Sequence, residues 1–150
     1  MSPRRARIKK LASHREKELE RHASRLAQAQ AAVSAARSLA DAEARRVEAA
    51  ERERCNLADG AVAGDRWREA NEWLEMRAFH HDAALHHLAG ARSVAERARE
   101  ELLEARAALR RLEVLDERLA SAEARVLERR ENALHDEIAA QKSARARRGG

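Results

Sequence analysis

The sequence predicts an all-α protein, a two-helix antiparallel coiled-coil hairpin with a longer second helix, on three observations. Apolar side chains recur at helical spacing along the 150 residues, and 36 of the apolar residues are alanines. Charged residues make up 38% and aromatic residues 2%, which is typical of long helices and too little apolar volume for a globular core. The one internal cluster of glycines separates two long segments. Disorder of the whole chain competes as an interpretation because charge is high, but the regular leucine spacing argues against it.

The first helix is predicted over residues 3–58. Ser2 is a favourable N-cap and Pro3 suits the first helical position. Apolar residues seven apart, with alanines three places after some of them, then define a seam: Leu19, Leu26, Val33, Ala40 and Val47, with Ala29, Ala36 and Ala50. Ile8 and Leu11 are out of phase with this seam by four residues, which predicts a stutter near Arg15.

The turn is predicted over residues 59–65, where Gly60 suits a left-handed position after the first helix and Asp65 can cap the second. The second helix is predicted over residues 66–143, followed by a basic tail over 144–150. Gly90 lies inside it and costs about 1 kcal/mol relative to alanine without ending a helix of this length. Its seam is predicted to contain Leu88, Ala91, Ala95, Ala98, Leu102, Ala105, Leu109, Leu112, Leu119, Val126 and Ala133.

The short turn sets a register in which position i faces roughly position 122 − i. This places Leu19 near Leu103 and Val33 near Ala89. In this register, the first helix has no residues left to pair with the second beyond about Ser121. The residues beyond that point still include Val126, Leu127, Leu134 and Ile138. We therefore expect these four side chains to bind a partner outside the paired region.

All three aromatic residues and four of the seven histidines lie within residues 66–87. On a helix, one face carries Trp67, Ala70, Leu74, Ala78 and Leu85 and is expected to pack on the first helix. The opposite arc carries Trp73, Met76, Phe79, His80, Ala83 and His87. Two interpretations remain open: the large residues seal the turn end of the hairpin, or the outer arc binds a partner.

Charge is concentrated at the two ends of the chain. Residues 1–15 sum to +6, residues 142–150 sum to +4, and the remainder sums to −5. Basic ends on a slightly acidic rod indicate contact with something negative. Nucleic acid is a weak candidate, because acids are interleaved along most of the chain and no aromatic residue lies near either basic end.

Catalysis, metal binding and membrane insertion are not expected. His80 and His87 lie about 10 Å apart along a helix, too far to share one ion, and the pair Asp82 and His86 has no evident third ligand. Neither a phosphate-binding loop nor a nucleophile paired with a base is present, so no cofactor is expected. Cys55 is the only cysteine, no apolar run approaches the roughly 20 residues that span a bilayer, and the basic start lacks the apolar segment of a secretory signal. A cytosolic protein is expected.

The overall plan resembles the FliJ/YscO family of coiled-coil stalk proteins of flagellar and injectisome type III secretion. The likeness lies in the length near 150, the basic start PRRARIKKLASHREKELE, the hairpin with a longer second helix, and the segment LERRENALHDEIAAQ. The resemblance implies a cytoplasmic stalk at the inner-membrane face of a secretion apparatus. It also implies a role in virulence if the injectisome branch applies, which the tryptophan-rich turn segment favours.

The resemblance further implies two protein partners and no enzymatic activity. The chain ends would enter the hexameric export ATPase and promote its assembly and turnover, through Arg4, Arg5, Arg7, Val126, Leu127, Leu134, Ile138, Arg145 and Arg147. The early second helix would engage the cytosolic domain of the export gate through Trp73, Met76, Phe79, His80, Ala83 and His87, of which four match the family's spacing. Export chaperones are a further partner class. The alternative function is a generic scaffold or tethering coiled coil that homodimerises through its C-terminal tail.

Overall fold

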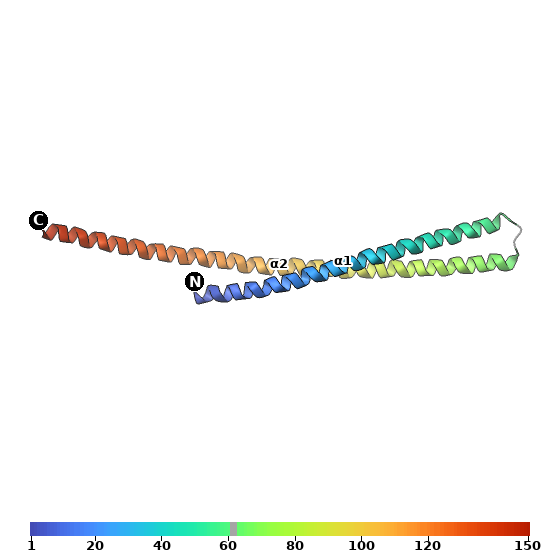
Figure 1. The fold of residues 1–150 in the computed structure, drawn as a ribbon, viewed down its shortest axis with the longest axis horizontal. Coiled ribbons are helices and arrows are strands. Elements are labelled where there is room, and N and C mark those ends of the chain that lie inside the picture. Colours follow the sequence, from blue (N-terminus) through green and yellow to red (C-terminus); the bar gives the residue numbers. More distant parts are fainter. Residues whose placement is uncertain (61–62) are drawn as a thin grey trace. The chain divides into compact units, whose positions relative to one another are not determined.

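The computed structural model describes residues 1–60 and 63–150 of the chain. Over these ranges it contains two helices and no strand: α1 spans Pro3–Ala58 and α2 spans Gly64–Arg148 (Figure 1). This confirms the all-α helical hairpin with a longer second helix. Nowhere in the described ranges is there a helix with the length and apolar character needed to cross a membrane.

The ends of the helices agree in part with the prediction. The Ser2 hydroxyl accepts a hydrogen bond from the Arg5 backbone N–H at 3.3 Å, so Ser2 is the N-cap of α1. None of the described glycines has positive φ, so the predicted left-handed Gly60 is wrong, and its N–H instead bonds the Leu57 carbonyl at 3.4 Å. The start of α2 also differs from the prediction. The Ala63 carbonyl accepts the first helical bonds, so Asp65 lies inside the first turn, where its charge favours the helix dipole.

The chain forms two compact units. Unit 1 comprises Met1–Glu18 and Ala105–Gly150, and unit 2 comprises Leu19–Glu104. Each unit contains one part of α1 and one part of α2. The contacts below are therefore described within each unit.

Unit 2 has a seam of small side chains. Its cluster of buried apolar residues consists of Ala36, Ala40, Ala84 and Leu88, with Val33 and Ala91 packed against it. The predicted positions from Leu19 to Ala50 on α1, and from Leu88 to Leu102 on α2, are all buried or half-buried. Because alanine buries far less apolar area than leucine, this seam brings the two backbones together with modest stabilisation per residue.

The register of unit 2 follows the turn as expected. His22 lies 3.7 Å from Glu101, and Arg54 donates a hydrogen bond to Asn71 at 3.4 Å. Both pairs agree with the 122 − i relationship to within one helical turn. The register placed Leu19 near Leu103 and Val33 near Ala89. Leu103 and Ala89 are exposed, and the inward positions beside them are the predicted seam residues Leu102 and Leu88.

Unit 1 is anchored by Ile8 and Leu109, which are both buried. Leu11 is exposed, so Ile8 alone belongs to the seam. The next inward apolar position is Ala12, four residues later, and Ile8 lies three heptads before the buried Ala29. The heptad spacing therefore continues through Arg15, and the predicted stutter there is wrong.

Candidate protein-binding surfaces

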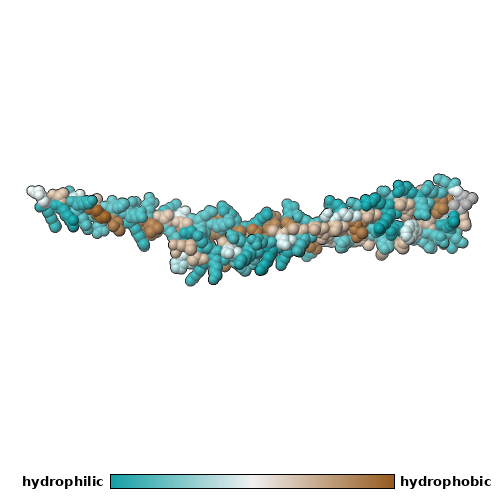
Figure 2. Space-filling model, in the orientation of Figure 1, coloured by the Kyte–Doolittle hydropathy of each residue, from teal (hydrophilic) through white to brown (hydrophobic). Residues whose placement is uncertain are grey.

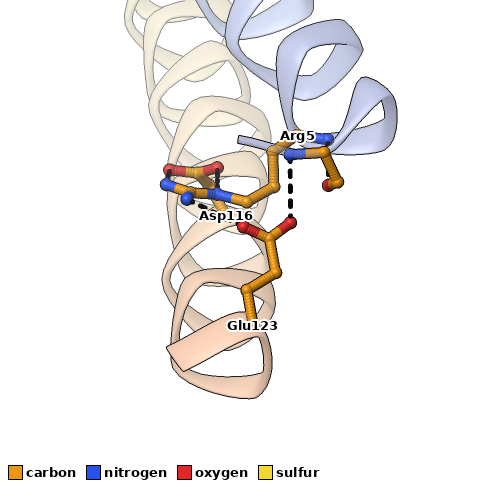
Figure 3. A network of polar contacts seen from close by, with 4 residues as sticks. Arg5, Asp116 and Glu123 are labelled. Carbon is orange, nitrogen blue, oxygen red and sulfur yellow. Dashed lines mark hydrogen bonds and ion pairs between the residues drawn. The ribbon is translucent and has the colours of Figure 1, made fainter. Parts of the chain in front are cut away.

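The start of α1 is tied to α2 by a terminal cluster of Ser2, Arg5, Asp116 and Glu123, all within unit 1 (Figure 3). The Arg5 Nε donates to Asp116 Oδ1 at 2.9 Å, and its Nη1 donates to Glu123 Oε2 at 3.2 Å. The Ser2 backbone N–H donates to Glu123 Oε1 at 3.3 Å. One guanidinium therefore holds two carboxylates that stand seven residues apart on α2.

The electrostatics of the terminal cluster follow from these bonds. Hydrogen bonding from Arg5 holds the pKa of Asp116 below its usual range. Hydrogen bonds from Ser2 and then Arg5 lower the pKa of Glu123 against partial desolvation. Arg5 was predicted to contact an ATPase, but its side chain is already engaged within the chain. Arg4 and Arg7, its neighbours in that prediction, are exposed.

Every residue from Ala124 to Gly150, here named the tail, is exposed. The tail is helical to Arg148, so α2 continues through the basic residues that were predicted to follow its end at 143. Leu127, Leu134 and Ile138 are spaced by seven and four residues and share one face, with Leu127 and Leu134 58% and 59% exposed. Figure 2 shows brown, hydrophobic side chains among teal ones on this part of α2.

The tail also contains predicted site residues off that face. Val126 lies next to the leucine face and is exposed, so Val126 and Ala133 are not seam positions as predicted. Arg145 and Arg147 lie in the last turn of α2, where positive charge is favoured by the helix dipole. The tail thus presents a single-sided apolar row followed by a basic helix end.

The turn-side patch comprises the predicted residues Trp73, Met76, Phe79, His80, Ala83 and His87, and all six are exposed. Phe79 is the most exposed of its large members at 72%, and its ring meets the His80 ring edge-on with centroids 6.1 Å apart. The Arg77 guanidinium lies over the Trp73 ring, 5.1 Å from its centroid, in a cation–π contact. The patch therefore exposes large side chains to solvent, two of which contact neighbouring side chains.

The inward face of this segment differs from the prediction at two positions. Ala70, Leu74 and Ala78 are half-buried as expected, but Trp67 is 39% exposed and Leu85 is exposed too. Ala84 takes the inward position instead of Leu85, because the seam steps through residues 74, 77, 81, 84 and 88. Trp73 borders a shallow hollow together with Glu53, Leu57, Arg66, Glu69 and Ala70.

Sequence reasoning missed two buried polar groups in the seam of unit 2. Glu43 is buried, and its Oε1 accepts from Arg46 Nη1 at 2.5 Å while Oε2 is buried without a partner among the described residues. His22 Nδ1 is buried and likewise lacks a hydrogen bond within the described part of the chain. The signal was available in the sequence, because Glu43 continues the spacing of Ala36, Ala40, Val47 and Ala50.

Residues 1–60 and 63–150 contain no group of three or more His, Cys, Asp or Glu side chains that could hold a metal ion. The candidate surfaces are an exposed apolar row, a basic helix end and an aromatic patch. Such features bind other macromolecules through surface complementarity. Together with the two-helix architecture, they define a helical-hairpin protein of the interaction class.

Comparison with protein families matches residues 4–148 to the family described as "Flagellar FliJ protein". The chain belongs to the FliJ family. A comparison with curated proteins gives no match, and neither does a comparison with solved structures. The matched description is the flagellar one, and nothing in it favours the injectisome branch.

Proposed function

We propose that this protein is a central stalk component of a type III export apparatus, acting in the cytoplasm at the inner-membrane face. In this role it links and stimulates the hexameric export ATPase and engages the export gate. Membership of the FliJ family supports the assignment to an export apparatus.

The observation that carries the ATPase proposal is the tail. It keeps Leu127, Leu134 and Ile138 on one exposed helical face beyond the last half-buried residue, Glu123. A single helix with an apolar row is stabilised by packing against a partner surface. A ring with a central pore would surround such a helix, and the basic end near Arg145 and Arg147 would add charge complementarity.

The test compares ATPase stimulation by the wild type and by the triple variant Leu127→Ser, Leu134→Ser, Ile138→Ser. Stimulation should fall by at least about tenfold, because hot-spot apolar contacts each contribute on the order of 1 to 2 kcal/mol. A matched control places three serines at exposed tail alanines, Ala124, Ala133 and Ala140. Equal loss of stimulation in both variants would show that the effect comes from lowered helix propensity. Undiminished stimulation by the variant at Leu127, Leu134 and Ile138 would contradict the proposal.

The gate contact is proposed for the turn-side patch. Trp73, Met76 and Phe79 are large, exposed and adjacent on α2, as binding anchors commonly are. Trp73→Ala should weaken binding to the export-gate cytosolic domain by about tenfold. Trp67→Ala serves as the matched control, since Trp67 is outside the patch, and equal loss in both variants would remove the patch from the gate contact.

The alternative function, a scaffold that homodimerises through the tail, is favoured by the same apolar row. Leu127, Leu134 and Ile138 have the seven and four spacing that also suits a second copy of α2. The two functions differ in stoichiometry. A scaffold forms a stable dimer alone, whereas a stalk remains a monomer that binds a ring.

A further inference from the structure

Unit 1 contains a row of exposed arginines that form no ion pair with the described residues of the chain. Between residues 105 and 125, α2 carries four acidic residues. Asp116 and Glu123 are engaged by Arg5, and Glu113 and Glu117 lie 3.3 and 3.5 Å from Arg110 Nη1. Over the described ranges, no ion pair involves the remaining row of Arg111, Arg118 and Arg125.

Apolar side chains lie between and beside the arginines of this row. One shallow hollow is lined by Arg110, Arg111, Val114, Leu115 and Arg118. A second hollow continues from it and is lined by Val114, Glu117, Arg118, Ser121, Ala122 and Arg125. Leu115 is 37% exposed, and with Ala122 it lies between the arginines.

The geometry of the terminal cluster brings α1 to the same side. Arg5 on α1 faces Asp116 on α2, and the two helices are antiparallel. In such a pair, the residues directly before the two facing residues point to the same side of the helix pair. Arg4 and Leu115 therefore share a side of unit 1. The same rule holds in unit 2, where Arg54 bonds Asn71 and the preceding Glu53 and Ala70 line one hollow.

We propose that this arginine surface, comprising Arg111, Leu115, Arg118, Ala122 and Arg125, docks an acidic amphipathic helix of a partner protein. The three arginines stand seven residues apart and span about 21 Å along α2, which matches the heptad repeat of a helix lying alongside. Guanidinium groups bind carboxylates in bidentate geometry. Leu115 and Ala122 then receive the partner's apolar side chains between its carboxylates.

Charge and shape favour an acidic helix over two other polyanionic partners, a membrane surface and single-stranded nucleic acid. A bilayer surface is bound by a broad apolar face, whereas this row offers Leu115 and Ala122 in single file. Single-stranded nucleic acid is bound by basic residues interleaved with aromatic ones, and unit 1 contains no aromatic residue. The occupant is therefore a helix that carries both carboxylates and leucines.

This inference goes beyond the stalk proposal and uses a different part of α2 from the tail. It adjoins Arg4, which was predicted from the sequence to contact the ATPase, so the experiment leaves Arg4 unchanged. The arginine-surface variant should keep ATPase stimulation, and the tail variant should keep peptide binding. Failure of one proposal is thereby distinguished from failure of the other.

The experiment measures fluorescence anisotropy of a labelled synthetic helix of about 21 residues, with glutamate and leucine at heptad positions, against the full chain. The double variant Arg111→Glu, Arg118→Glu should bind at least about tenfold more weakly, and Leu115→Ser about threefold more weakly. The matched control, Arg92→Glu with Arg99→Glu, has the same charge change and spacing on exposed positions of unit 2, and should change affinity less than about twofold.

Circular dichroism of each variant checks that the helices are intact. Three results would overturn the proposal: equal weakening in the Arg92 and Arg99 control, equal binding of a scrambled peptide of the same composition, or no measurable binding by the wild type. Preferential binding of vesicles containing anionic lipid, or of single-stranded DNA, with the same loss in the double variant, would also overturn it by assigning the surface to that polyanion.

Discussion

The Arg5 guanidinium bridges Asp116, at 2.9 Å, and Glu123, at 3.2 Å, and so fastens the start of α1 to α2 within unit 1. The two carboxylates are two helical turns apart, so one side chain restrains a length of α2 as well as its own helix. An Arg at this position is suited to the task because its planar group offers several donors in fixed directions.

Removal of this bridge should loosen the first turns of α1. We expect Arg5→Gln to increase amide hydrogen exchange at residues 5–9 while exchange at Ala36 and Ala40, in unit 2, stays unchanged. Arg4→Gln is the control, because Arg4 is exposed. If both variants exchange alike, the bridge does not restrain the helix start.

The stabilising effect of this bridge should also depend on pH. The pKa values of Asp116 and Glu123 are lowered in the folded chain, so their stabilising effect is present above the ordinary carboxyl pKa, about 4, and is lost as pH falls through the lowered values. Protection of residues 5–9 should therefore decline below roughly pH 4. Asp116→Asn should weaken that decline. An unchanged pH profile in this variant would show that other carboxylates control it.

Leu88 tests the packing of unit 2. It is 7% exposed within the cluster of buried apolar residues, whereas Leu103 is 52% exposed on the same helix. Leu88→Ala should lower the free energy of unfolding by about 2 to 3 kcal/mol, because the truncation leaves space in the seam. Leu103→Ala should cost less than about 0.5 kcal/mol. Similar values from urea denaturation of the two variants would contradict the seam.

Glu43 is expected to weaken the seam that contains it. One of its carboxylate oxygens is buried without a partner in the described ranges, and the side chain occupies a position that the heptad spacing assigns to an apolar residue. Glu43→Leu should therefore raise the melting temperature, since it removes a desolvated charge and adds apolar contact. A lowered melting temperature would show that the bond with Arg46 outweighs this cost.

The heptad spacing was sufficient to predict the helices and most of the seam. Val33, Ala36 and Ala40 were assigned correctly because each lies on one straight periodic row. The errors arose where the fixed angle of a straight helix drifts from the 3.5-residue period that the seam follows. Leu85 was placed inward by a single angle per residue, but the inward row passes through Ala84 beside it.

The candidate site was less accessible to sequence reasoning. The sequence pattern predicted that the turn-side patch is exposed, because its residues lie on the side of the helix away from the seam. The engagement of Arg5 by Asp116 and Glu123 did not, because it depends on which carboxylates the register brings opposite the start of α1. A basic run alone indicates charge, whereas the fold decides which of its members remain available to a partner.

The most direct test of the central claim is native mass spectrometry of the chain with the export ATPase, alone and mixed. The stalk proposal predicts a 16.9 kDa monomer alone and one chain bound per ATPase hexamer, with binding lost when Leu127, Leu134 and Ile138 are replaced by serine. A stable homodimer that dissociates in the same serine variant and does not bind the hexamer would contradict the proposal and establish the tethering alternative.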